Sequence, residues 1–217
     1  MKLSLGYCFH GTKAGLDVPN LFYRKEQMNK YLARSATIFA LSFPLSVTAQ
    51  EVLVESRNVA LSLMQQLGAE LKKEIAAGGP AAAVKVCTKI APELATRLSL
   101  QTGWRVTRVS LKVRNSLLGT PDSWEQQALK DFDARAAAGE AAEKLEHSET
   151  VSESGGKFFR YVKALPVQPL CLACHGADAQ IDDAVRSSLA QNYPHDQATG
   201  YTLGQVRGAV SIKRLVP

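Results

Sequence analysis

The sequence predicts an α+β domain in which N-terminal helices precede a mostly antiparallel sheet, with a cofactor bound on a loop. Three observations lead to this prediction. The chain has 217 residues, of which 46% are hydrophobic and 21% charged, as in a globular domain of ordinary size. Helical spacing of apolar residues dominates the first part of the chain, and strand-like runs dominate the second. A C-x-x-C-H motif lies on a loop-like stretch after one of these runs.

Residues 28–49 have the features of a Sec signal peptide. A basic start is followed by an apolar stretch at 36–45 and by small residues before Ala49, where we expect cleavage. The apolar stretch could instead be a buried helix, but it is shorter than the ~20 residues of a membrane span. Residues 1–27 are interpreted as an extension upstream of the true start. We therefore expect a periplasmic protein, with no stable membrane anchor after cleavage and a single mature domain at 50–217.

The positive charge is concentrated in the leader. The chain has 26 basic and 20 acidic side chains, and residues 1–49 hold six of the basic and two of the acidic ones. The remaining 20 basic and 18 acidic side chains nearly cancel. A nucleic-acid-binding surface would concentrate Lys and Arg on the folded part, so no nucleic-acid partner is expected.

Two helices are predicted at the start of the mature chain, over 51–77 and 80–99, separated by Gly78-Gly79. Cys87 falls on the apolar stripe of the second helix. Pro92 follows it, and because proline disrupts a helix interior, we expect a kink or a division just past the cysteine.

A half-buried strand is predicted next, at 102–115, where apolar and polar residues alternate. Its polar face carries Arg108, Lys112 and Arg114. The elements expected after it are a helix at 120–142 capped by Asp122 or Ser123, a strand at 156–167, a short helix at 182–194 and a closing strand at 203–216.

The C-x-x-C-H motif consists of Cys171, Cys174 and His175. A structural zinc site needs four protein ligands, and no second C-x-x-C or H-x3-H is present. A thioredoxin-type dithiol needs a βαβ setting, which this proline- and glycine-containing stretch lacks. The third reading is covalent heme c, with both cysteines as thioethers and His175 as the proximal iron ligand. Heme attachment in bacteria takes place outside the cytoplasmic membrane, so the predicted export and the motif support each other.

The sixth iron ligand has several candidates. Cys87 is the cysteine left over in the mature chain, and its helical spacing suits either a core residue or a ligand. Met64 lies in an amphipathic helix, where methionine commonly fills the core. His147 lies in a polar stretch typical of a solvated strand or loop, and His195 lies in a loop close after the motif.

Five stretches together resemble a family of bacterial c-heme domains with a PAS-like fold, long known only as a domain of unknown function. They are "AVKVC", "RVSLKVRNSLLGTPDSWE", "FRYVKAL", "CLACHG" and "LGQVRGAVSI". The resemblance extends over about residues 52–214. The chain departs from the family at Ser116-Leu117-Leu118-Gly119, where the family usually has a proline and a second asparagine. This difference affects the expected loop conformation and no ligand.

The resemblance implies a PAS-like antiparallel sheet with flanking helices, and a heme ligated by His175 and Cys87. A thiolate ligand favours Fe(III) and lowers the reduction potential. The basic face of Arg108, Lys112 and Arg114 would meet the propionates or simply face solvent. We expect a redox or small-gas sensor that acts through a redox or signalling partner, with a soluble mono-heme electron-transfer cytochrome as the alternative. Enzymatic activity is not expected, because a distal cysteine leaves no open position on the iron.

Overall fold

The structure is a computed structural model that describes residues 48–216. The predicted extension at 1–27 lies outside this range, as does the predicted signal peptide at 28–49 except for its last two residues. Thr48 caps the first helix, since its hydroxyl accepts from the Glu51 N–H while the Glu51 carboxylate accepts from the Thr48 N–H. Processing after Ala49 would remove this cap. No helix between residues 48 and 216 combines the length and the apolar character that a membrane crossing requires.

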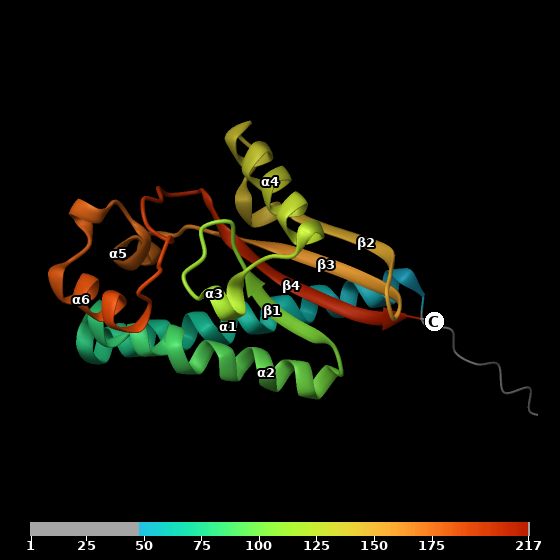
Figure 1. The fold of residues 1–217 in the computed structure, drawn as a ribbon, viewed down its shortest axis with the longest axis horizontal. Helices are drawn as coiled ribbons and strands as arrows, with labels where there is room; N and C mark the ends of the chain where they lie inside the picture. The colour runs from blue at the N-terminus through green and yellow to red at the C-terminus, as the bar shows by residue number, and fades with distance from the viewer. Residues whose placement is uncertain (1–47, 217) are drawn as a thin grey trace, which may run out of the picture. The chain divides into compact units, whose positions relative to one another are not determined.

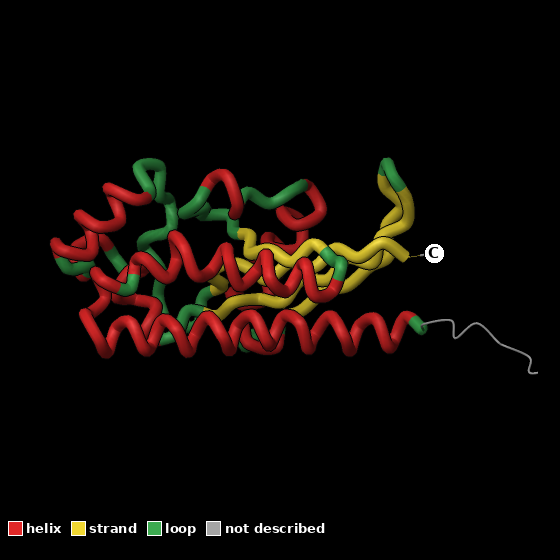
Figure 2. The backbone as a smooth tube through the Cα atoms, turned by 90° about the horizontal axis from the view of Figure 1, so that it is seen from below, coloured by secondary structure: helices red, strands yellow, loops and turns green. Residues whose placement is uncertain are grey.

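The N-terminal part is helical, as predicted. Helix α1 (Ala49–Ala82) is kinked at Gly79, whose φ of 77° only glycine adopts readily, so the predicted break appears as a kink. A π-helical turn, η1 (Val86–Ile90), carries Cys87 and leads directly into α2 (Ala91–Thr102). Pro92 lies in the first turn of α2, directly after its junction with η1. Figure 2 shows α2 running alongside the long α1.

The sheet has four antiparallel strands in the order β1-β4-β3-β2. They are β1 (Arg105–Val109), β2 (Glu146–Glu153), β3 (Gly156–Pro166) and β4 (Val206–Val216). One difference from the sequence prediction stands out. The strand expected over 102–115 ends at Val109, because the next N–H, that of Ser110, bonds to the Gly119 carbonyl instead of to a strand. The stretch around His147, expected as a strand or loop, is edge strand β2.

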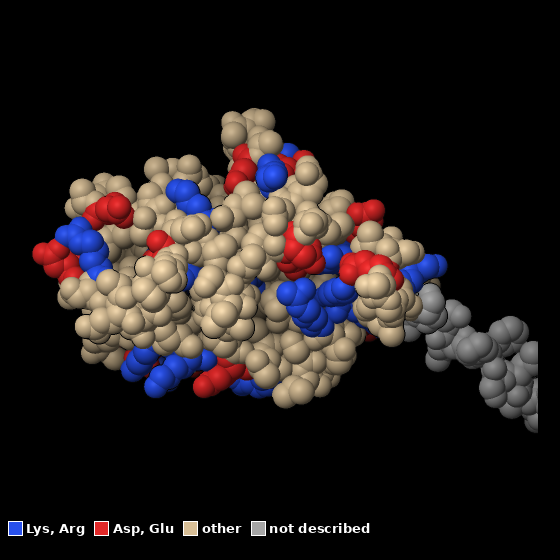
Figure 3. Space-filling view, in the orientation of Figure 1, with Lys and Arg blue, Asp and Glu red and all other residues tan. Residues whose placement is uncertain are grey.

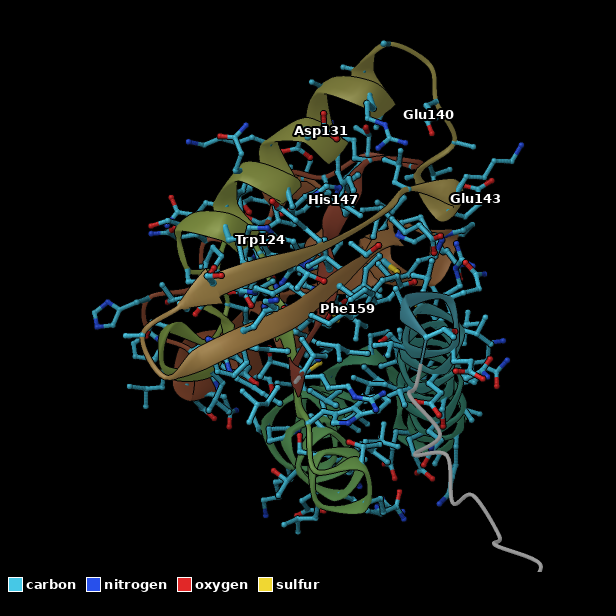
Figure 4. All side chains as sticks on the ribbon, turned by 90° about the vertical axis from the view of Figure 1, so that its right-hand side faces the viewer. Trp124, Asp131, Glu140, Glu143, His147 and Phe159 are labelled. Carbon is cyan, nitrogen blue, oxygen red and sulfur yellow. The ribbon has the colours of Figure 1, made fainter. Side chains whose placement is uncertain are left out.

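Helices cover both faces of the sheet (Figure 1, Figure 4). On one face α1 and α2 pack a core that includes Leu63, Leu94, Tyr161 and Ile212. On the other face α4 (Ser123–Ala137) packs Leu129 and other side chains onto the sheet. These two cores hold the helices and the sheet together as one α+β arrangement.

The start of α4 is fixed by two carboxylates of the "PDSWE" stretch. Asp122 caps the helix in a capping box with Glu125, whose side chain is fully buried. Ser211 Oγ donates to Glu125 Oε1 over 2.6 Å, and Arg160 Nη2 lies 2.6 Å from Asp122 Oδ2 and 3.4 Å from Glu125 Oε1. Arg160 belongs to the "FRYVKAL" stretch, so two of the resemblance motifs meet here in a structural ion network.

The segment with the C-x-x-C-H motif lies beyond one end of the sheet, next to the kinked end of α1 (Figure 1). It consists of η3 (Pro169–Cys171), α5 (Leu172–His175), η4 (Asp178–Gln180) and α6 (Asp183–Asn192). Val185 and Leu189 of α6 pack with Val84, Cys87 and Cys174. The π-helical turn is thereby held beside the motif.

Two smaller elements complete the fold: α3 (Ser116–Gly119) and η2 (Ala142–Lys144). The α3 turn is the segment that departs from the family pattern, and the Asn115 side chain caps it by accepting from the Leu117 and Leu118 N–H groups. Figure 3 shows Lys and Arg interspersed with Asp and Glu on one face of the molecule.

Candidate functional site

A cavity of about 430 Å³ lies between α2, β1 and the C-x-x-C-H segment. This volume is within the range of small-molecule and cofactor sites. Cys87 contributes to its lining from η1, and His175 from α5. Two residues distant in sequence, each predicted as an iron ligand, thus face one cavity. Its other lining residues include Arg108, Arg114, Tyr193 and Arg207, with Leu100 and Leu118 at exposed positions.

One hydrogen bond fixes the ring of His175. Its Nδ1 lies 2.6 Å from the carbonyl oxygen of Ala198, and a carbonyl only accepts, so Nδ1 carries the proton. Burial, together with the positive charges of Arg207 and Arg114, lowers the pKa of His175 well below its ordinary value. The imidazole is therefore neutral, and the lone pair of Nε2 is available to a metal.

Arg207 lies against the same ring. Its Nε is 3.2 Å from His175 Nδ1 and 3.4 Å from Nε2. Nearly equal distances to both ring nitrogens mean that the guanidinium lies over the ring face and not in line with either lone pair. Nη1 donates to Ser110 Oγ over 2.8 Å, and the Tyr201 ring meets His175 edge-on, with 6.2 Å between the centroids. The ring plane of His175 is thus set from several sides.

Arg114 connects the motif to the loop that holds His175. Its Nε pairs with Asp196 Oδ2 at 2.8 Å, and Nη2 donates to the Cys174 carbonyl at 2.6 Å and to the Ala198 carbonyl at 3.3 Å. The same Ala198 carbonyl therefore accepts from both Arg114 and His175. A buried cation here orients the histidine through the backbone.

The motif cysteines are partly buried free thiols, as is Cys87. Burial raises the pKa of Cys174 to about 11, against the opposing effect of Arg114. Cys171 Sγ accepts from the Gln168 N–H over 3.4 Å. Across residues 48–216, His, Cys, Asp and Glu form no group of three that could hold a metal ion by itself. The site has two soft or neutral donors and a cavity, which suits a metal that brings its own equatorial ligands.

A family model described as Tll0287-like matches residues 44–214 of the chain. The chain belongs to the Tll0287-like family. Among solved structures, the crystal structure of the cyanobacterial heme-protein Tll0287 is similar, with 25% sequence identity and a TM-score of 0.60. The match covers 78% of this chain and 98% of that one. No curated protein matches the chain.

The family resemblance inferred from the motifs is confirmed, since the matched range contains every motif that carried it. The α+β class is confirmed as well, because the N-terminal helices and the four-stranded antiparallel sheet match the Tll0287 structure. The roles of Cys171, Cys174, His175 and Cys87 in binding a cofactor stay predictions.

The other candidate ligands of the Tll0287-like chain lie away from the cavity. Met64 packs against the core between α1 and the sheet. His147 lies on β2 beside Trp124 of α4, with 5.5 Å between ring centroids, on the far side of the sheet (Figure 4). His195 is exposed and does not line the cavity. Of the four candidates, the cavity brings only Cys87 together with His175.

The three residues of the predicted basic face have different surroundings in the structure of this Tll0287-like chain. Arg114 pairs with Asp196, and Lys112, whose ammonium donates to the Thr199 carbonyl over 3.0 Å, does not line the cavity. Arg108 lines the cavity. Sequence reasoning missed Arg207, for which the signal was a lone arginine at the start of the apolar run "VRGAVSI".

Gly208 follows Arg207 and explains how closely β4 approaches β1. Its φ is 155°, and a Cβ there would lie only 2.4 Å from the Val109 carbonyl oxygen. Only glycine permits this approach. The glycine thus brings the backbone of Arg207 close to the end of β1, where the cavity begins.

Proposed function

We propose that the chain is a c-type heme protein, with heme attached through Cys171 and Cys174 and ligated by His175 and Cys87. One observation carries the proposal: His175 and Cys87 line one cavity, and the Nε2 lone pair of His175 is left available by the hydrogen bond from Nδ1. The heme-protein named among the similar structures supports the choice of cofactor.

The residues present fit a heme. The cavity has a cofactor-sized volume and is lined both by apolar residues of α2 and by arginines, as an amphipathic porphyrin with two carboxylates requires. The attachment cysteines adjoin His175 in sequence, and Cys174 packs with Cys87 in one cluster. When bound, the heme supplies an iron that exchanges one electron and can bind small gases.

The chain's own residues determine how such an iron behaves. His175 is held neutral and is oriented by Ala198 and Arg207, so its Nε2 would bind the iron. Cys87 would ligate as a thiolate after losing its Sγ proton, and an anionic sulfur favours Fe(III) over Fe(II). Cys87 lies on a short π-helical turn and not within a regular helix, and such turns are frequent at functional sites.

We infer a periplasmic redox or small-gas sensor with a PAS-like arrangement of sheet and helices. Loss of the thiolate on reduction would open a coordination position, and η1 would transmit the change to α2. Its partner would be a redox or signalling protein. Catalysis is not proposed, because His175 and Cys87 would both hold the iron of the oxidised protein.

A soluble electron carrier is the second candidate, favoured by the apolar rim of the cavity. Leu100 and Leu118 line the cavity yet are 81% and 55% exposed. Exposed leucines around a cofactor edge suit transient docking of a redox partner.

A spectroscopic redox titration of the purified holoprotein, with and without CO, tests the proposal. A sensor should lose the thiolate signature on reduction and then bind CO. A carrier should stay six-coordinate and refuse CO in both oxidation states. A purified protein from which denaturation removes all heme would contradict covalent attachment.

A further inference from the structure

Four arginines line the cavity, and the structure divides them into two pairs. Arg105 lies 3.7 Å from the Glu125 carboxylate, and Arg114 lies 2.8 Å from that of Asp196. Within residues 48–216, neither Arg108 nor Arg207 forms an ion pair with a carboxylate. The cavity therefore carries two positive charges that the described part of the chain leaves uncompensated.

These two arginines are not ordinary solvated side chains. Both are partly buried. Arg108 and Arg207 line the same cavity as the buried Arg114, so three cations share one lining. Placing unpaired cations close together in a partly buried site is unfavourable unless an anion joins them.

Both side chains also keep unused donors. Arg207 is held by Nε over the His175 ring and by Nη1 at Ser110 Oγ, while its Nη2 donates to no residue in the described range. Arg108 makes no side-chain hydrogen bond to any residue between 48 and 216, although it lines the cavity. An arginine with free donors is suited to binding a carboxylate.

We propose that Arg108 and Arg207 are the counter-charges for the two propionates of the bound heme, one arginine for each carboxylate. This inference rests on the proposed function, because the propionates arrive only with heme. Arg207 would then make two interactions at once, because the guanidinium that lies over the His175 ring would also pair with a propionate. Of the three basic residues predicted to meet the propionates, only Arg108 keeps that role, and Lys112 and Arg114 do not.

Charge compensation gives the inference a measurable consequence. Two propionates and a Cys87 thiolate all favour Fe(III), and two nearby guanidinium groups oppose them. Removing either guanidinium should lower the midpoint potential. Arg108→Gln and Arg207→Gln should each shift the Fe(III)/Fe(II) equilibrium about tenfold toward Fe(III), which is about 59 mV for a one-electron couple. Arg108→Lys and Arg207→Lys should retain most of the potential, because the charge remains.

The experiment measures midpoint potentials and propionate bands in resonance Raman spectra of the holoproteins, with Arg97→Gln as the matched control. Arg97 is exposed on α2 and does not line the cavity, so its variant should change neither readout. Shifted potentials with unchanged propionate bands would mean that the arginines act only through their field, and would overturn the pairing. If Arg207→Gln does not fold, Arg108→Gln alone tests the assignment. The Arg108 side chain makes no hydrogen bond to any described residue, so its replacement removes none.

The inference and the proposed function fail in different ways. Unchanged potentials and bands in variants that carry heme would overturn the propionate assignment alone. Absence of covalent heme from the unaltered protein would overturn the proposed function, and the assignment with it.

Discussion

Arg114 and Asp196 form an ion pair beside the C-x-x-C-H segment, with 2.8 Å between Nε and Oδ2 and side chains only 6% and 12% exposed. The pair holds the loop whose Ala198 carbonyl accepts the Nδ1–H of His175. It therefore links protein stability to the orientation of the histidine. Mutation of a partner that orients a metal-ligating histidine commonly lowers metal affinity about 10- to 100-fold.

Asp196→Asn should destabilise the holoprotein by roughly 3–5 kcal/mol, because it leaves the Arg114 cation buried without an anion. Denaturant unfolding measures this effect. Asp183→Asn is the control, since the Asp183 side chain is 89% exposed and its pair with Arg186 lies at the surface. Equal stability losses in the two variants would contradict the importance of burial at Asp196.

The ion network on the opposite face of the sheet should matter for stability and not for the cofactor. Arg160→Met leaves the carboxylates of Asp122 and Glu125 without their buried partner, so a loss of roughly 3–5 kcal/mol is expected. The control Arg135→Met should cost much less, because the ion pairs of Arg135 lie at the surface. The absorption spectrum of the folded Arg160→Met holoprotein should be unchanged. A changed heme spectrum would place this network in contact with the cofactor site after all.

Glu146 should contribute to loss of stability in acid. Burial raises the pKa of Glu146, but hydrogen bonds from Arg57 and Tyr161 outweigh that effect and lower it below its ordinary value. A carboxylate with a lowered folded-state pKa stabilises the protein above its unfolded pKa of about 4.3, and this stabilisation is lost as the pH falls through the folded value. Glu146→Gln should therefore flatten the dependence of unfolding free energy on pH below about 4.3. The exposed control Glu143→Gln should not, and identical curves for Glu146→Gln and the unaltered protein would sink the prediction.

Local patterns predicted much of the fold. Helical spacing located α1 and α2, glycine marked the kink, and Asp122 was one of the two predicted caps of α4. Continuous apolar runs located β3 and β4. These signals depend on residues close together in sequence, so they can be recognised without knowledge of the tertiary structure.

Edge strand β2 and the full set of site residues were harder to predict. Strand β2 is at the edge of the sheet and pairs with β3 alone. Its side chains are mostly polar, so the sequence shows little of the alternation of apolar and polar residues that marks a strand. Alternation continued past Val109, but the chain leaves the sheet there to form the cavity wall. Arg207 lies between the two β4 residues that pair with Leu165 and Pro166 at the end of β3, from which the chain continues to His175, and a linear pattern does not reveal this pairing.

Covalent attachment should depend on the two motif cysteines and not on the third. Cys171→Ser with Cys174→Ser removes both thiols that form thioethers, so heme staining after denaturation should disappear. Cys87→Ser is the matched control and should keep the stain, since it removes a cysteine of the same cluster that forms no thioether. Mass spectrometry of the denatured proteins should show the mass of heme on the control alone. Heme that remains on the double variant would refute attachment at this motif.

Cys87 should determine the spin state and the potential. With the thiolate bound, ferric protein should be low-spin with a thiolate signature in its electronic and electron paramagnetic spectra. Cys87→Ala should give a high-spin or water-bound ferric heme and a higher potential, because loss of an anionic ligand removes charge that favours Fe(III).

The rival ligands supply the controls for Cys87. His195→Ala and Met64→Leu should leave the ferric spectra unchanged, since His195 is exposed and Met64 packs in the core away from the cavity. Reduction of the unaltered protein should weaken the thiolate bond, because Fe(II) attracts an anionic sulfur less than Fe(III) does, whereas the Cys87→Ala protein has no such bond to lose. The unaltered protein should therefore bind CO only when reduced, with a delay set by thiolate release, and Cys87→Ala should bind it without that delay. A Cys87→Ala protein with unchanged ferric spectra, beside a His195→Ala protein that turns high-spin, would reverse the assignment and reduce Cys87 to a core residue of the π-helical turn.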